Sequence, residues 1–87
     1  MDIPINRKIA IVRNHITLIR DQIFSSNLDA KIAETIEDEP AKLAAMEKIR
    51  RGLKALDFLD ALLVNLEKKL NDEIKETKDA WDFSGDL

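Results

Sequence analysis

The sequence predicts an all-α protein that folds as a long antiparallel helical hairpin. Apolar residues recur at alternating spacings of three and four along two stretches of nearly equal length, and Pro40 stands between them. The chain has 87 residues, of which 45% are hydrophobic, with two glycines and no cysteine. This composition fits one small helical domain, and it excludes a disulfide scaffold or a thiol-based catalytic site.

The first arm is expected to contain two helices, over about 4–24 and 27–39, with a kink between them. The apolar seam of the first helix consists of Ile5, Ile9, Val12, Ile16, Ile19 and Ile23. Ser25-Ser26-Asn27 interrupts this seam, and Ser26 followed by Asp29 resembles a capping box that restarts a helix. The apolar face is expected to continue through Leu28, Ile32 and Ile36. If the break is a full turn, the chain forms a three-helix bundle instead.

The second arm is expected to be one long helix over about 41–78. Pro40 favours a fresh helix start there, because proline breaks a helix interior but is tolerated in a first turn. The seam of this helix consists of Ile49, Leu56, Leu59, Leu63, Leu66 and Leu70. Residues 1–80 are thus assigned to the hairpin domain, and residues 81–87 to an acidic, aromatic C-terminal tail.

An antiparallel fold-back at Pro40 places residues side by side when their numbers add to about 80. At this register Arg13 meets Glu67 and Arg20 meets Asp60, all four at e positions along one edge of the seam. Further predicted pairs are Lys8 with Asp72, Arg7 with Glu73, and Asp29 with Arg51. Each exposed pair contributes about 0.2–1 kcal/mol, so the pairs select the register more than they stabilise the fold.

The opposite edge of the hairpin is expected to expose apolar side chains. The predicted oligomer interface consists of Ile11, His15, Leu18, Ala55, Phe58 and Leu62. A two-helix hairpin buries a single apolar stripe, while ordering each residue costs about 1–2 kcal/mol of backbone entropy. We therefore expect a homo-oligomer resembling a four-helix bundle, or a higher assembly.

The tail supplies a second interaction hypothesis. Trp81 and Phe83 are two of the four aromatic residues, and Asp82 lies between them. An acidic segment with two aromatics is suited to an apolar groove with a basic rim on another protein. The competing interpretation is that Trp81 packs back onto the end of the hairpin.

Candidate catalytic and metal-binding residues are scarce. His15 is the only histidine, and no acidic residue stands three or four positions from it, so a helical metal-ligand pair is missing. The two glycines are isolated, so no phosphate-binding loop is present. The sequence predicts no catalytic residue, no metal site and no cofactor, and it assigns His15 to packing or to an interface.

One spacing of carboxylates resembles an enzyme family. Glu34-x-x-Glu37 is followed by Asp57-x-x-Asp60 and Ala61-Leu62-Leu63, which is similar to the paired acidic motifs of the all-α MazG-type nucleotide pyrophosphohydrolases. The resemblance implies four carboxylates that hold Mg²⁺ and hydrolyse a nucleoside triphosphate. Asp57 stands where that family has glutamate.

The charge pattern limits the classes of partner. The net charge is −3, and the basic cluster on the second arm consists of Lys48, Arg50, Arg51 and Lys54. No aromatic residue is interleaved with these cations, so nucleic-acid binding is not expected, whereas a small anionic ligand or nucleotide between subunits is the alternative. No apolar run is long enough for a membrane span or a signal peptide, so we expect a cytoplasmic protein.

These observations predict a non-enzymatic helical module for protein–protein interaction that binds itself and another protein. An adaptor, an assembly subunit and a small inhibitor of a larger protein all fit this description. Small acidic helical proteins without cysteine are common among bacterial and phage accessory factors, so such a factor is one candidate.

Overall fold

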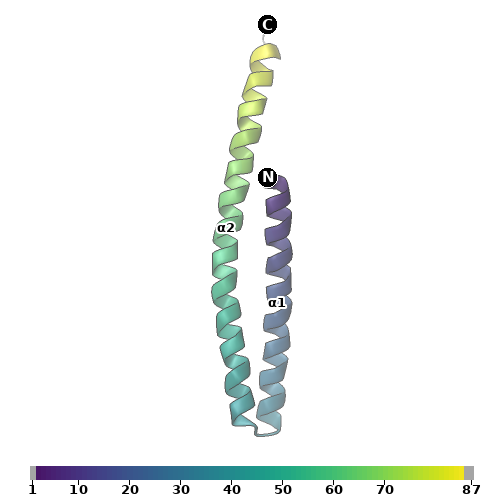
Figure 1. Ribbon diagram of the computed structural model, residues 1–87, viewed down its shortest axis with the longest axis vertical. Coiled ribbons are helices and arrows are strands. Elements are labelled where there is room, and N and C mark those ends of the chain that lie inside the picture. The colour runs from purple at the N-terminus through teal and green to yellow at the C-terminus, as the bar shows by residue number, and fades with distance from the viewer. Residues whose placement is uncertain (1, 86–87) are drawn as a thin grey trace.

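The computed structural model describes residues 2–85, with side chains described as far as Ile74. Two helices, α1 (Ile5–Thr35) and α2 (Glu39–Gly85), run antiparallel and pack against each other along the length of α1 (Figure 1). The molecule is a rod with extents of 75 × 26 × 14 Å. The predicted all-α hairpin is confirmed.

The connection between the helices lies earlier in the chain than predicted, because it occupies residues 36–38 and not the single position 40. The amide of Asp38 donates to the carbonyl of Ala33 at 2.8 Å, and the amide of Glu37 donates to that of Glu34 at 3.2 Å. Glu37 has a φ of 59°, so the pattern is a Schellman motif in which glutamate takes the left-handed position. This motif closes α1 before Pro40 is reached.

Asp38 then starts α2. Its carboxylate accepts a hydrogen bond from the amide of Ala41 at 3.2 Å, which satisfies one of the free amides of the first turn. Pro40 is the second residue of α2, where its missing N–H costs nothing. The proline thus lies in the first turn of the second arm and does not form the bend itself.

The break predicted at Ser25-Ser26-Asn27 is absent, since α1 is one helix from Ile5 to Thr35. The three-helix alternative and the separate helices over 4–24 and 27–39 are therefore wrong. Ser26 is only 7% exposed, because it occupies the next position of the seam. The heptad pattern continues through Ser26, Ala30 and Ala33. Packing along this continuous seam overrides the weak helix propensity of serine and asparagine.

The prediction that Leu28, Ile32 and Ile36 continue the apolar face is wrong for the same reason. All three side chains are exposed, while the small residues one or two positions away face α2. A seam of alanine and serine is invisible to a search for large apolar residues. The three exposed side chains are consequently available for other contacts.

The seam between the helices has two unlike halves. In the half near the N-terminus, Ile9, Val12, Ile16 and Leu66 form a buried cluster, and the large residues packed around it are Ile5, Leu56, Leu59, Leu62, Leu63 and Leu70. In the half near the connection, the buried residues are small, namely Ser26 and Ala33 on α1 and Ala45 on α2, and Gly52 of α2 packs against Ile23. Small side chains let the helices approach closely, so this half buries little apolar surface.

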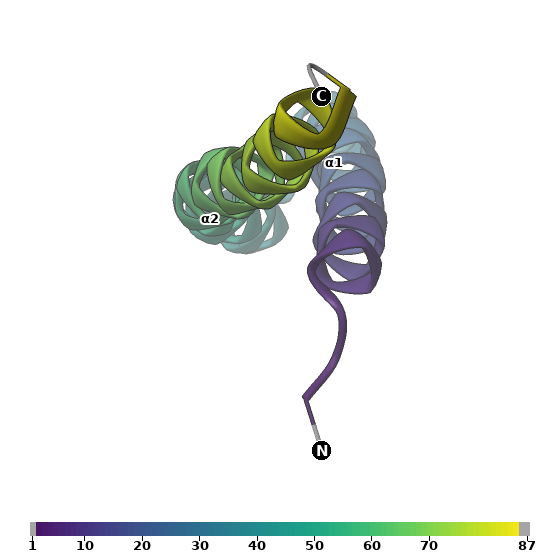
Figure 2. The same ribbon diagram turned by 90° about the horizontal axis from the view of Figure 1, so that it is seen from above.

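α2 is 47 residues long and α1 is 31, so α2 projects beyond the start of α1. Pro4 and Ile5 line the same hollow as Leu70 and Glu73, which marks the level where α1 begins. We call residues 74–85 the projecting end, and Figure 1 shows that it continues past the N-terminus of α1. Figure 2 looks along the rod and shows the two helices side by side. The segment predicted as a tail from residue 81 thus belongs to α2 as far as Gly85.

Candidate interaction surface

One edge of the hairpin carries an ion pair between the helices. The guanidinium of Arg13 donates from Nη2 to Oε1 of Glu67 at 3.0 Å, as the sequence predicts. The Arg13 side chain is mostly exposed and the Glu67 side chain is partly exposed, so the pair contributes at most about 1 kcal/mol. The pair mainly shows the register, that is, which residues of the two helices lie at the same level.

Four other predicted pairs are absent within the part of the chain with described side chains. No ion pair joins Arg20 to Asp60, Lys8 to Asp72, Arg7 to Glu73, or Asp29 to Arg51. Exposed pairs between long side chains offset little of the rotamer entropy that they restrict, so a matching register alone does not form them.

Arg51 is engaged within its own helix instead. Its Nε donates to Oε1 of Glu47 at 3.2 Å, and Nε of Arg50 donates to Oε2 of the same carboxylate at 2.9 Å. The hydrogen bond from Arg50, together with the positive charges of Arg50 and Arg51, lowers the pKa of Glu47 to about 2. Glu47 therefore stays ionised far below neutral pH.

The opposite edge is the surface of interest. We call it the flank and define it by the c and g heptad positions of both helices, which include the predicted interface residues Ile11, His15, Leu18, Ala55, Phe58 and Leu62. Phe58 is the most open of these, at 67% exposure, and Ile11 and Leu18 are also exposed. Ala55 and Leu62 are half-buried, since they border the seam. The flank is thus an apolar strip that the hairpin itself leaves uncovered.

His15 lies in the middle of this strip. Its Nδ1 is 3.0 Å from the carbonyl oxygen of Ile11, one turn earlier in α1. Because a carbonyl oxygen only accepts, Nδ1 carries the proton of this hydrogen bond. This bond holds the ring along the surface of α1.

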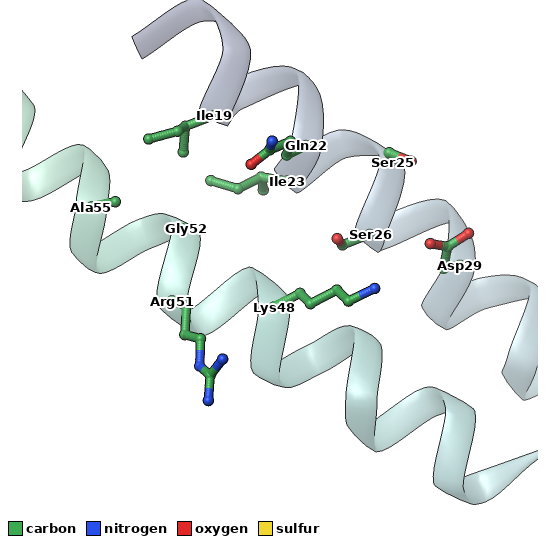
Figure 3. Close-up of a pocket in the computed structure, with 10 residues that line it drawn as sticks. All are labelled: Ile19, Gln22, Ile23, Ser25, Ser26, Asp29, Lys48, Arg51, Gly52 and Ala55. Atoms are coloured by element: carbon green, nitrogen blue, oxygen red, sulfur yellow. The ribbon is translucent and has the colours of Figure 1, made fainter. Parts of the chain in front are cut away.

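Toward the connection, the flank becomes hollow and polar. A groove of about 550 Å³ opens where Gly52 and Ser26 supply no large side chain, and Lys48 extends across it toward Ser26 and Asp29 (Figure 3). Arg51 points away from this groove in the same view. A second hollow of about 350 Å³ follows, with lining residues that include Ile32, Ile36, Ala41 and Ala44.

A further apolar cluster was not predicted. Phe24, Met46 and Leu53 are at least half exposed, at b and e positions on the edge of the Arg13–Glu67 pair but nearer the connection. We call these three residues the second edge. The e positions of α2 are apolar at Met46 and Leu53 and acidic at Asp60 and Glu67, and this difference is the sequence signal that could have found the cluster.

The predicted partner-binding residues Trp81, Asp82 and Phe83 belong to the projecting end, and their side chains lie outside the described residues. The packing of Trp81 on the hairpin and its binding to a partner therefore both stay predictions.

The carboxylates of the enzyme resemblance do not converge. The hairpin places Asp57 and Asp60 beside the middle of α1, about 20 Å along the rod from Glu34. Among the residues that the structure describes, no three His, Asp or Glu side chains are grouped to hold a metal ion. Within the same residues, no helix has the length and apolar character needed to cross a bilayer.

Comparison with protein-family models, with curated proteins and with solved structures gives no match to this chain.

Proposed function

We propose that this protein is a non-enzymatic, cytoplasmic helical module that assembles with itself through the flank and serves as an adaptor or assembly subunit. One observation carries the proposal: the two helices leave more apolar side chains outside than they enclose. Among the described side chains, six hydrophobic residues are buried, thirteen large ones are exposed, and none is less than 2% exposed.

The surface area supports the same conclusion. The chain exposes 7194 Å², whereas a folded monomer of 9.9 kDa exposes about 5200 Å². This excess, about 2000 Å² per chain, is larger than the roughly 800 Å² that each partner buries in a standard interface. Stacking a second hairpin on the flank would cover Ile11, Leu18 and Phe58 and would give both copies a closed core.

The second edge supports the role of an adaptor. Phe24, Met46 and Leu53 face away from the flank, so contacts with another protein there would not compete with self-association. Aromatic residues and methionine are enriched in the centres of protein interfaces. A small anionic ligand is less well supported, because Asp29 shares the groove with Lys48, and Arg51 is already bonded to Glu47.

Sedimentation at micromolar concentration tests the proposal with two matched variants. Phe58 and Phe24 are 67% and 66% exposed, but only Phe58 lies on the flank. We expect the native chain to be an oligomer, Phe58→Asp to be a monomer, and Phe24→Asp to remain an oligomer. Circular dichroism checks that each variant is helical. A native chain that sediments as a folded monomer would contradict the proposal.

A further inference from the structure

We propose that the second copy packs on the flank in the antiparallel direction, about a two-fold axis near His15 and Leu62. The projecting end of each copy then runs along the half of the other copy where residues 36–38 connect that copy's two helices. This inference rests on the proposed self-association and adds the arrangement and register of the two copies.

The register within one hairpin fixes which residues of α1 and α2 lie at the same level on the flank. Gln22 and Asp29 of α1 and Lys48 and Ala55 of α2 all line the groove on the flank and stand at g positions. The register set by the Arg13–Glu67 pair places Gln22 at the level of Ala55 and Asp29 at the level of Lys48. Residue numbers at one level of this edge therefore add to about 77, slightly less than the value that the sequence predicts. Once the level of one helix is known, that of the other is fixed.

The α1 side of the flank places the axis. A two-fold axis pairs residue i with j and also j with i. With His15 opposite its own counterpart, Ile11 of one copy meets Leu18 of the other in both directions. The exposed apolar residues of α1 then cover one another, and the α1 numbers that meet add to about 30.

The axis placed by α1 also fixes which α2 residues of the two copies meet. With the hairpin register fixed, this axis brings together α2 residues whose numbers add to about 124. Leu62 then faces its own counterpart, and Arg51 faces Asp72 of the other copy. This meeting of opposite charges played no part in placing the axis, so it is an independent agreement.

Both members of that charged pair are accessible. Arg51 and Asp72 are exposed, and Asp72 has no ion-pair partner among the described side chains. Arg51 is bonded to Glu47 of its own helix through Nε, so the contact with Asp72 would be made by its two terminal Nη groups. At the same register, Lys48 falls opposite position 76, which the sequence fills with glutamate. The basic part of the flank on one copy thus meets the acidic part on the other, twice in the dimer.

The projecting end favours the antiparallel direction over a parallel one. In a parallel pair, the two projecting ends leave the bundle on the same side, and neither lies along an α1. In the antiparallel pair, residues 74–85 run beside the hollow lined by Ala41 and Ala44 of the other copy, as far as its connection. The longer helix is then supported along its whole length.

Charge reversal tests this register with the full chain. We expect Arg51→Glu and Asp72→Arg each to raise the dimer dissociation constant about tenfold, and the double variant to restore it to within about threefold of the native value. Lys54→Glu is the control, because Lys54 is a neighbouring cation at an f position away from the flank. Sedimentation equilibrium gives the constants, and circular dichroism verifies folding.

The outcomes separate the two proposals. A native dimer whose single variants weaken association without rescue in the double variant would overturn the antiparallel register but keep self-association. If the native chain is a dimer and neither single variant weakens association, the antiparallel register is likewise overturned and self-association is kept. A native chain that is monomeric would overturn both proposals.

Discussion

Gly52 of α2 faces Ile23 of α1 so closely that a Cβ on Gly52 would lie 2.7 Å from Cγ1 of Ile23. Such a contact requires the isoleucine to move, and a β-branched side chain in a helix has one strongly preferred χ1 rotamer. The absence of a side chain at position 52 therefore sets how closely the helices approach, and it also opens the groove on the flank.

Replacing Gly52 separates helix propensity from this contact. Gly52→Ala gains about 0.5–1 kcal/mol of propensity, but in the native background the clash with Ile23 offsets this gain. In an Ile23→Ala background the gain should appear in full. Ile19→Ala is the control background, because the Cγ2 of Ile19 would be an ordinary 3.7 Å from the new Cβ. Urea unfolding measures all five variants, and equal effects in every background would disprove the contact.

Substitutions at Ser26 test whether the seam of α1 continues through this residue. We expect Ser26→Leu to destabilise the protein by about 1–3 kcal/mol, because a large side chain at this buried position forces the closely packed helices apart. Ser25→Leu should change the free energy of unfolding by less than about 0.5 kcal/mol, since Ser25 is exposed. If both substitutions were tolerated alike, Ser26 would not lie between the helices.

The sequence predicts more of the hairpin than of its connection. Regular heptads of large residues, from Ile5 to Ile23 and from Leu56 to Leu70, identify both helices and their shared seam, and Arg13 with Glu67 sets the register. Ser26 and Ala33 escape prediction because small residues have no apolar signal, although they are what allows close packing. The end of α1 depends on the left-handed backbone of Glu37, which no side-chain pattern announces.

The flank could be predicted for a related reason. Ile11, Leu18 and Phe58 are large apolar residues at heptad positions that a two-helix seam cannot cover, so their exposure follows from the geometry of the seam. The second edge depends on Met46 and Leu53, which stand at positions where charged residues are normal. The polar groove depends on the missing side chain of Gly52, and only the packed helices reveal it.

The connection supplies a prediction about backbone strain. Glu37→Gly should stabilise the hairpin by up to about 1 kcal/mol, because glycine adopts the left-handed conformation without the penalty that glutamate has. Glu34→Gly is the matched control and should destabilise it by about 1 kcal/mol, since Glu34 lies in regular helix. Thermal unfolding compares the two, and a loss of stability in both would refute the assignment of the Schellman motif.

Asp38 should matter for the start of α2. Asp38→Ala removes the carboxylate that accepts the amide of Ala41, so we expect a loss of about 1 kcal/mol. Asp38→Asn retains an acceptor and should recover most of it. If alanine and asparagine were equivalent in urea unfolding, the cap would have no energetic role.

The lowered pKa of Glu47 predicts a dependence on acid. A carboxylate whose pKa falls from 4.5 to about 2 on folding stabilises the folded state fully above pH 4.5, and this contribution is lost as the pH falls toward 2. Glu47→Gln should therefore lose less helix content than the native chain between pH 4.5 and 2. Because the group is exposed, the difference should shrink in high salt.

Glu34→Gln provides the comparison for that experiment, since Glu34 has no ion-pair partner among the described side chains. It should follow the native profile measured by circular dichroism. A Glu47→Gln profile identical to the native one at low salt would show that Arg50 and Arg51 do not stabilise the ionised carboxylate.

The distance between spin labels on the two copies tests self-association through the flank most directly. The chain has no cysteine, so Asn14→Cys and Thr35→Cys each give one label per copy, on the outer face of α1. The antiparallel arrangement predicts about 20 Å between labels at position 14, near the axis, and about 60 Å between labels at position 35. Equal short distances at both positions would indicate a parallel pair, and no dipolar coupling at position 14 would contradict association through the flank.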